Sequence, residues 1–316
     1  MKNFAITGVA GYIAPRHLKA IKETGNNLSA AVDPNDSVGI IDKFFFETRF
    51  FKEFERFDRH IEKLRKRGDS EKVHFVSICS PNYLHDAHIR FALRIGADAI
   101  CEKPLVINPW NIDPLIELEQ EFGKRIYTIL QLRVHPSLIA LRERVHMENR
   151  KTKHDVVLTY ITSRGNWYLN SWKGNIEQSG GLATNIGIHF FDLLIWLFGK
   201  VEGVEVHYSN HTRIAGYLEL ERATVRWYLS INRSDLPQLV TPGENTTFRS
   251  ISVDNNEVEF SAGFTDLHKT VYQQICDGKG FGAEDARASI ILAHTIRNSL
   301  PIGKTGRSHA LVKNLL

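Results

Sequence analysis

Short apolar runs alternate with amphipathic ones through the first 145 residues, and this alternation strongly limits the folds that the chain can adopt. Apolar runs at 4–7, 28–32, 73–78, 97–101 and 126–130 predict strands, and runs at 15–24, 50–67, 83–95 and 113–122 predict the intervening helices. Strands that alternate with helices at this spacing form a parallel, doubly wound sheet. Such sheets bind ligands beyond the carboxyl ends of their strands, so functional residues are expected there.

The pattern changes beyond residue 150, where short β-rich runs follow one another with little helix between them. Strands are expected at 156–161, 204–208, 217–221, 224–231, 250–253 and 257–260, with Asp254-Asn255-Asn256 as a hairpin turn, and helices at 184–198, 265–276 and 283–299. This succession predicts a mostly antiparallel sheet. A polar segment at 148–151 separates the two patterns, so we expect two domains, residues 1–150 and 151–316.

Composition and charge exclude one class of partner. The 316 residues are 42% hydrophobic and 24% charged, which is typical of a globular protein. The formal net charge of +4 suggests at most an anionic ligand. The basic run Arg65–Arg67 lies in an amphipathic helix pattern and is expected to be a solvated helix end, so we expect no nucleic-acid partner.

Cysteine usage and hydropathy indicate the compartment. Three widely spaced cysteines, Cys79, Cys101 and Cys276, do not suit a disulfide framework and fit a reducing environment. The chain runs directly into a strand pattern without a signal segment. The longest apolar stretch, 186–198, contains two polar residues and is too short to span a bilayer. We therefore expect a cytoplasmic protein with no membrane partner.

A glycine-containing turn, Gly8-Val9-Ala10-Gly11-Tyr12-Ile13-Ala14, follows the first expected strand and opens the first expected helix. Glycines there permit a tight turn and let backbone N–H groups approach a pyrophosphate, although the spacing is GxxGxxA rather than GxGxxG. Asp33 ends the second expected strand, where a carboxylate accepts hydrogen bonds from ribose hydroxyls of NAD and repels the extra phosphate of NADP. The alternative for Asp33 is a turn residue at a strand end.

The strongest strand pattern ends in Ser80-Pro81-Asn82, on the edge where a dinucleotide would lie. Ser80 and Asn82 are equally suited to cap the following helix. His85 and His88 share a face of that helix, but no third ligand is near them, so we expect no metal site.

Cys101-Glu102-Lys103-Pro104 delivers a lysine to the end of the next expected strand. Proline stiffens the turn by fixing its own φ, and it disfavours helical geometry at the lysine. A lysine at this edge can orient a substrate hydroxyl, or exchange its proton if neighbours depress its pKa. The alternative is a surface turn whose lysine contacts only water.

The expected helix 184–198 carries a polar stripe on an otherwise apolar surface. Asn185, His189 and Asp192 are spaced four and three residues apart, which places them on one helical face. A buried polar group requires a partner, so this stripe indicates a site. The alternative is a histidine satisfied within the core.

Together, the glycine turn, Ser80-Pro81-Asn82, Glu102-Lys103-Pro104 and Gly187-x-His189-x-x-Asp192 resemble the Gfo/Idh/MocA oxidoreductases over essentially the whole chain. This resemblance implies a Rossmann domain and hydride transfer between a sugar-like carbinol and NAD, with Lys103 and His189 catalytic. The family usually has aspartate at the position of Asn185, which shifts the expected proton transfer to His189 and Lys103. The implied cofactor-binding residues are Gly8, Gly11, Tyr12, Ile13, Ala14, Asp33, Ser80, Pro81, Asn82, His85, Glu102, Lys103 and Gln131.

The expected fold class is therefore α/β. A Rossmann-type, doubly wound parallel sheet is followed by a second α/β domain with a large open, mostly antiparallel sheet. Family members pair through the open face of that second sheet, and the segment 224–229 alternates large side chains on both faces. The resemblance thus implies a homodimer or homotetramer.

Three segments, 10–17, 77–85 and 161–168, more narrowly resemble the bacterial UDP-N-acetylglucosaminuronic acid 3-dehydrogenases of O-antigen synthesis. Arg164 and Lys173 can meet phosphates or a carboxylate, and aromatic residues between them offer stacking faces. The alternative is an aromatic loop packed on the sheet or at a subunit contact. The implied substrate-binding residues are Lys103, Arg164, Asn166, Trp167, Tyr168, Trp172, Lys173, Asn185 and His189.

We interpret the chain as an NAD-dependent dehydrogenase that oxidises the sugar C3 hydroxyl of a UDP-linked uronic acid. One alternative is a dehydrogenase of a free polyol or sugar, which would not require the basic aromatic loop. Another is a non-catalytic NAD-binding regulator, which would need neither Lys103 nor His189. The sequence does not decide which of these two residues accepts the proton.

Overall fold

The computed structural model describes residues 1–149, 151–237, 246–260 and 267–315, and the chain divides into two compact units. The first unit comprises Met1–Gln131 and Thr265–Arg287, and the second comprises Leu132–Phe264 and Ala288–Leu316. This division differs from the single boundary expected near residue 150. A late segment joins the first unit because helix α9 (Leu267–Cys276) packs against helix α1 (Ala14–Glu23) and buries its own apolar face.

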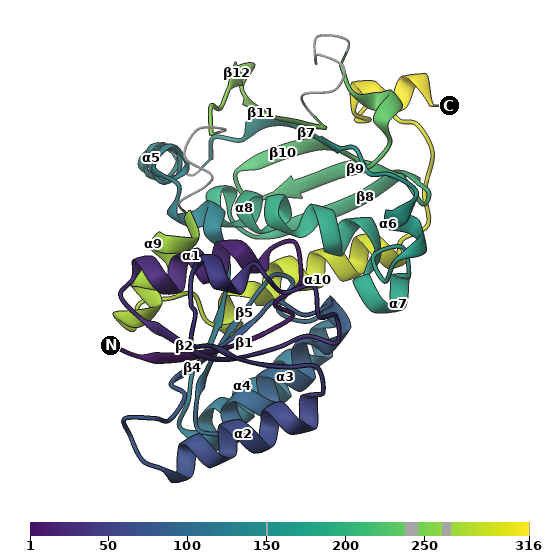
Figure 1. Ribbon diagram of the computed structural model, residues 1–316. Helices are drawn as coiled ribbons and strands as arrows, with labels where there is room; N and C mark the ends of the chain where they lie inside the picture. Colours follow the sequence, from purple (N-terminus) through teal and green to yellow (C-terminus); the bar gives the residue numbers. More distant parts are fainter. Residues whose placement is uncertain (150, 238–245, 261–266, 316) are drawn as a thin grey trace. The chain divides into compact units, whose positions relative to one another are not determined.

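The first unit is built on a six-stranded parallel sheet in the order β3-β2-β1-β4-β5-β6. Its strands are β1 (Asn3–Thr7), β2 (Asn27–Val32), β3 (Arg49–Phe51), β4 (Phe75–Ile78), β5 (Asp98–Cys101) and β6 (Ile126–Thr128). Its other helices are α2 (Phe54–Lys66), α3 (His85–Arg94) and α4 (Ile112–Phe122). Figure 1 shows α2, α3 and α4 on one face of this sheet and α1 and α9 on the other. The predicted doubly wound sheet is confirmed.

Burial on both faces explains why the central strands read as continuous apolar runs. All four residues of β4 are buried, as expected for a parallel sheet covered on both sides. Strand β3 was not predicted, because three residues are too few to show a strand period. The strand order reverses between β1 and β4, so their carboxyl ends lie at the position where such sheets bind ligands.

The second unit contains a mixed sheet in the order β12-β11-β7-β10-β9-β8. Among the strands described for this unit, β7 and β10 pair in parallel and the other neighbours pair antiparallel, so the prediction of a mostly antiparallel sheet is confirmed. The strands are β7 (His154–Thr162), β8 (Val201–Ser209), β9 (Arg213–Leu220), β10 (Ala223–Ser230), β11 (Thr247–Val253) and β12 (Asn256–Glu257). The predicted hairpin between β11 and β12 is present, and Asp254 and Asn255 there have φ of 50° and 65°.

The helices of the second unit are α5 (Pro136–Met147), α6 (Trp167–Asn170), α7 (Ile176–Ser179) and α8 (Ile188–Phe198). Helix α10 (Ala283–Asn298) belongs to both units, because the first unit ends at Arg287 and the second resumes at Ala288. Helix α5 has no counterpart in the sequence prediction. Among the described residues, 3₁₀ segments lie at Ile41–Lys43, Asn82–Leu84, Pro109–Asn111, Gln131–Val134, Arg233–Asp235 and Ala310–Asn314, and a π-helical turn at Ala183–Gly187.

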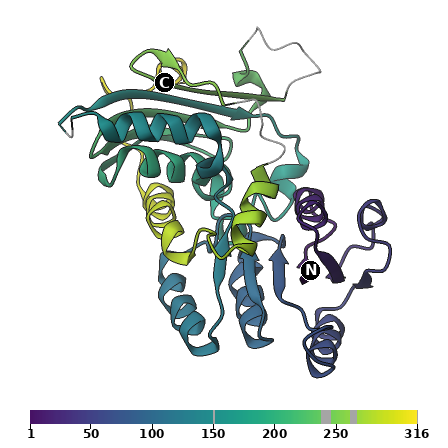
Figure 2. The same cartoon turned by 90° about the vertical axis from the view of Figure 1, so that its left-hand side faces the viewer.

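The two faces of the second sheet are covered to different extents. Figure 2 shows α5 and α8 on one side of it, and there the Trp227 ring lies 5.4 Å from Phe191 of α8. On the opposite face, Tyr228 and Ile161 form a small core cluster with Val312 of the last 3₁₀ segment. The open face is therefore covered in part by the end of the described chain.

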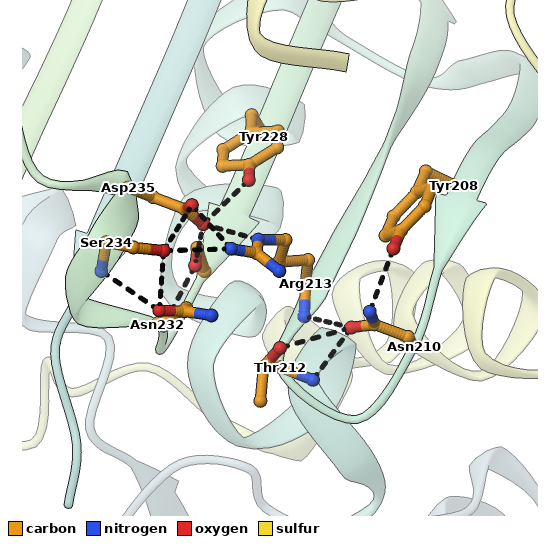
Figure 3. A network of polar contacts seen from close by, with 9 residues as sticks. Tyr208, Asn210, Thr212, Arg213, Tyr228, Asn232, Ser234 and Asp235 are labelled. Carbon is orange, nitrogen blue, oxygen red and sulfur yellow. Dashed lines mark hydrogen bonds and ion pairs between the residues drawn. The ribbon is translucent and has the colours of Figure 1, made fainter. Parts of the chain in front are cut away.

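A polar network closes one end of this sheet. Figure 3 shows Asp235 accepting hydrogen bonds from the Arg213 guanidinium, at 2.8 Å from both Nε and Nη2, and from the Tyr228 hydroxyl at 2.8 Å. Burial would raise the pKa of Asp235, but these donors outweigh it and hold the pKa below its ordinary value. Asn210 closes the neighbouring β8–β9 turn by accepting from the backbone N–H groups of Thr212 and Arg213, also drawn in Figure 3.

One described segment, Ile176–Phe198, is long and apolar enough to cross a membrane by length and composition. It is longer than the stretch considered from the sequence, because α7 and the π-helical turn continue into α8. Within its most apolar window 78% of the residues are buried inside the protein, which is the behaviour of a core helix.

Candidate functional site

The glycine turn after β1 lies directly against the end of β4. Gly8 has φ of 75°, and a Cβ there would lie 2.5 Å from backbone atoms of Cys79 and Ser80, so only glycine fits. At Gly11 a Cβ would lie 3.0 Å from the Gly8 carbonyl oxygen. Helix α1 begins three residues later. This close backbone, followed by a helix N-terminus, fits the pyrophosphate of a dinucleotide.

Asp33 stands beside this turn at the end of β2. Its side chain accepts hydrogen bonds from the backbone N–H of Ala10 at 3.0 Å and of Asn35 at 2.9 Å. The carboxylate thus stabilises both the glycine turn and the turn at the end of its own strand. Asp33 therefore also has the structural role of a turn residue that the sequence offered as the alternative. Two carboxylate oxygens offer about four lone pairs, which leaves capacity to accept from ribose hydroxyls.

Most polar side chains that follow β4 make hydrogen bonds to other residues of the first unit. The Ser80 hydroxyl lies 2.8 Å from Nδ1 of His88, and burial lowers the pKa of His88 to about 4. The ring nitrogens of His85 lie 2.6 Å from the Pro104 carbonyl oxygen and 2.9 Å from that of Ser80. His85 therefore ties the end of β4 to the Lys103–Pro104 turn, where the peptide bond is cis. Asn82 is also buried.

Gln131 lies at the end of the first unit, just beyond β6. It is 5% exposed, and its Oε1 is buried with no hydrogen-bond partner among the described residues. A buried carbonyl oxygen without a donor is costly, so this atom is suited to accept a hydrogen bond from a bound ligand.

Glu102, next to Lys103, is directed into the interior rather than outward. Its Oε1 lies 2.9 Å from Nε2 of His17 and 3.1 Å from Nε2 of His268. Burial would raise the pKa of Glu102, but the two N–H donors outweigh it and hold the pKa well below its ordinary value. Burial lowers the pKa of His17 despite the nearby carboxylate, so an ionised Glu102 faces a neutral His17 that donates to it.

The contact with Glu102 fixes the tautomer of His17 and extends the chain of hydrogen bonds. Because Nε2 donates to Glu102, Nδ1 accepts from the Tyr272 hydroxyl at 2.7 Å. The Tyr272 oxygen then accepts from Ser77 of β4 at 2.6 Å. This buried cluster, called here the Glu102 cluster, joins α1, β4, α9 and the end of β5.

Glu102 was expected to contact the cofactor. For its carboxylate this expectation is corrected, because the carboxylate is hydrogen-bonded to two buried histidines. His17, Glu102 and His268 are also the one group among the described residues whose ligand atoms, all within 4.8 Å, could hold a metal. Their N···O spacings are those of N–H···O hydrogen bonds, which account for the arrangement without an ion. No signal in the sequence spacing pointed to these histidines.

Helix α8 carries the polar stripe of the second unit, preceded by the π-helical turn Ala183–Gly187. Nδ2 of Asn185 donates to the Tyr168 hydroxyl at 2.6 Å. Asp192 accepts two hydrogen bonds from Arg133, at 2.9 and 2.7 Å. Both Asn185 and Asp192 are buried, and His189 between them is partly exposed. His189 is therefore the member of the stripe most accessible to a substrate, which disfavours a wholly buried core histidine.

The loop from Arg164 to Lys173 brings cations and aromatic rings together. Nζ of Lys173 lies 4.3 Å from the Trp172 ring centroid and 5.7 Å from that of Trp167, which is 55% exposed. Burial lowers the pKa of Lys173, and the charge of Arg164 lowers it further. Two cations held near each other in a partly buried loop favour an anionic ligand.

Tyr168 was expected to offer a stacking face, and this expectation is corrected. The residue is 3% exposed, because α6 turns it into the unit where its hydroxyl meets Asn185. Asn166, at the start of the loop, is exposed. Arg133, the partner of Asp192, was not identified from the sequence because it lies 59 residues away.

Two family models match the chain. Residues 2–129 match the Gfo/Idh/MocA model described as an oxidoreductase family with an NAD-binding Rossmann fold. Residues 154–288 match the model of the C-terminal α/β domain of the same oxidoreductase family.

Solved structures resemble the whole chain. The WlbA (WbpB) dehydrogenase from Thermus thermophilus is 54% identical, with a TM-score of 0.93 over 98% of this chain and 100% of that chain. It was solved with NAD and alpha-ketoglutarate, and with NAD and UDP-GlcNAcA. The WlbA dehydrogenase from Bordetella pertussis, at 18% identity and a TM-score of 0.75 over 96% of this chain and 98% of that chain, shares the fold.

Curated relatives align over shorter regions. D-glucoside 3-dehydrogenase from Escherichia coli K12 is 28% identical over 43% of this chain and 39% of that protein. Inositol 2-dehydrogenase from Corynebacterium glutamicum is 28% identical over 46% of this chain and 42% of that protein. The aligned part therefore spans less than half the length of these relatives.

The Glu102 cluster yields a stability prediction. We expect His17→Leu to lower the free energy of unfolding by about 2–4 kcal/mol, because Glu102 then keeps one N–H donor and Tyr272 loses its acceptor. His17→Gln, which retains a donor and an acceptor, should recover at least half of the loss. Urea unfolding monitored by circular dichroism measures both variants.

Equal unfolding free energies for His17→Leu and the unmodified protein would show that the cluster contributes nothing net. A chelator that destabilised the unmodified protein would instead indicate a bound metal in place of the hydrogen bonds.

Proposed function

Because the chain belongs to the Gfo/Idh/MocA family of NAD-binding oxidoreductases, we propose that it is an NAD-dependent dehydrogenase that oxidises the C3 hydroxyl of a UDP-N-acetylhexosaminuronic acid. The observation that carries the substrate class is the 54% identity to all of a Thermus thermophilus dehydrogenase solved with NAD and UDP-GlcNAcA. The basic aromatic loop from Arg164 to Lys173 supports the same class. A role in O-antigen synthesis is part of this proposal.

The cofactor assignment follows from residues of the first unit. The glycine turn would receive the pyrophosphate, Asp33 the adenosine ribose and Gln131 a polar group of the nicotinamide half. When bound, NAD supplies a nicotinamide C4 that accepts a hydride. Ser80 and His85 would position the backbone of this site and not contact NAD through their side chains, because those side chains are hydrogen-bonded to other residues of the first unit.

The chemistry of the substrate is assigned to Lys103 and His189. Oxidation of a secondary alcohol removes the hydroxyl proton and transfers the carbinol hydrogen with its electron pair, which leaves a 3-keto sugar. His189 accepts the hydroxyl proton, and the Lys103 ammonium donates a hydrogen bond that orients and polarises the same oxygen. Asn185 cannot accept the hydroxyl proton, because a carboxamide is not a base. Its side chain donates a hydrogen bond to the Tyr168 hydroxyl, and it would line the substrate site on the same helical face as His189.

The expected assembly is also a proposal. The open face of the second-unit sheet carries partly exposed residues such as Val157, Tyr217 and Arg226, which suit a contact with a second copy. We propose a cytoplasmic homodimer or homotetramer. Sedimentation at micromolar concentration measures the mass, and a monomer there would contradict the assembly.

The deciding experiment supplies the purified protein with NAD and a panel of sugars, and follows NADH absorbance. We expect turnover of UDP-N-acetylglucosaminuronic acid well above that of UDP-N-acetylglucosamine, because Arg164 of the loop would bind the additional carboxylate. Turnover of free myo-inositol or a glucoside, with none of a sugar nucleotide, would favour the free-sugar alternative. NAD binding without turnover of any sugar would favour a regulator.

Cofactor choice gives a second prediction. NAD should bind well and NADP poorly, because the Asp33 carboxylate repels a 2′-phosphate, and Asp33→Ala should narrow this difference. Fluorescence titration with both nucleotides measures the two affinities. Equal affinities in the unmodified protein would remove Asp33 from the ribose site.

A third prediction concerns turnover. Lys103→Ala and His189→Asn should each reduce kcat by about a hundredfold or more, while NAD affinity stays within about twofold. His146→Asn, which changes an exposed histidine of α5, is the matched control and should leave kcat unchanged. Near-normal kcat in His189→Asn would return His189 to a structural role.

A further inference from the structure

A pocket of about 110 Å³ lies wholly within the second unit. Its walls come from four parts of that unit, namely the segment from Tyr168 to Ile176, the turn at 180–183, the β8–β9 turn and helix α10. Three of the lining side chains are basic: Lys173, His211 and Arg297. The basic aromatic loop supplies only the first of them, so the pocket extends beyond the residues identified from the sequence.

The charges around this pocket are unbalanced toward positive. Lys173 and Arg297 are both half-buried, and burial lowers the pKa of each from its ordinary value. Arg164 adds a third positive charge near Lys173. The opposing carboxylate is Glu177, whose charge acts on Arg297. Among the described residues named for these effects, Lys173, Arg164 and Arg297 outnumber Glu177, and such positive charge in a partly desolvated space favours an anion with more than one negative charge.

The backbone around the pocket is closely packed and requires glycine at two positions. Gly180 and Gly181 have φ of 78° and 71°, and a Cβ on Gly180 would lie 2.6 Å from the Thr184 side chain. Gly174 is equally constrained, since its Cβ would lie 2.2 Å from the Leu169 carbonyl oxygen. Asn210, which also lines the pocket, braces the β8–β9 turn by accepting hydrogen bonds of 2.9 and 2.8 Å from the backbone N–H groups of Thr212 and Arg213, as Figure 3 shows.

We propose that this pocket binds the diphosphate of the sugar nucleotide, with Arg297 and Lys173 as its two cationic contacts. The inference rests on the proposed function and names the residues that would hold the nucleotide end of the substrate. A diphosphate presents two adjacent anionic groups, which two separate cations can contact at once. The exposed Trp167 ring near Lys173 is placed to stack on the base or sugar.

The test is calorimetric titration of NAD-loaded protein with UDP, UDP-N-acetylglucosamine and UDP-N-acetylglucosaminuronic acid. Arg297→Met should raise Kd for all three ligands by about ten- to a hundredfold, because each carries the diphosphate, and should leave the Kd of NAD unchanged. Lys173→Met, on a different element, should act in the same direction. Arg287→Met is the matched control, because Arg287 lies on the same helix and does not line the pocket.

Each other outcome overturns the assignment in a distinguishable way. Loss of affinity for the uronic acid alone would mean that Arg297 contacts the sugar carboxylate. Unchanged affinities in both variants, with normal oxidation of the UDP-uronate, would reject the pocket and keep the proposed function. If the unmodified protein bound neither UDP nor a UDP-sugar, both the pocket assignment and the proposed function would fail.

Discussion

The buried carboxylate of Glu102 is the interaction on which the first unit depends. An ionised carboxylate in a protein interior is strongly unfavourable unless donors replace its water, and here His17 and His268 donate to the same oxygen. One donor comes from the helix that follows the glycine turn, and the other from α9 near the end of the chain. The residue after Glu102 is Lys103, so the same carboxylate anchors the backbone that carries the proposed catalytic lysine.

Several polar residues of the motifs support others rather than face a ligand. His85 spans the carbonyl oxygens of Ser80 and Pro104, and Asp192 is paired with Arg133. Such side chains make their hydrogen bonds inside a unit, where an unpaired polar group would cost free energy. This arrangement leaves fewer side chains to meet ligands, and one of them is Gln131, whose carbonyl oxygen accepts no hydrogen bond from the part of the chain that the structure describes.

The second unit concentrates positive charge where the chain is least regular. The residues near Lys173 belong to two short helices and tight glycine turns, which bring basic groups close together without a continuous element. Holding cations side by side in a partly buried place weakens stability, and proteins retain such arrangements at sites for anions. In the sheet of the same unit, the Asp235 network ties strand β9 to strand β10 through Arg213 and Tyr228.

Local features were readable from the sequence alone. The alternation of apolar and amphipathic runs determined the parallel sheet, and the glycine turn, Asp33 and Lys103 were placed at strand ends because each belongs to a short contiguous pattern. Only the tertiary structure decided that Glu102 meets His17 and His268, which lie 85 and 166 residues away. It likewise buried Tyr168. The physical reason is that periodicity is set by neighbouring residues, whereas the partner of a buried polar group is set by which distant elements share its core.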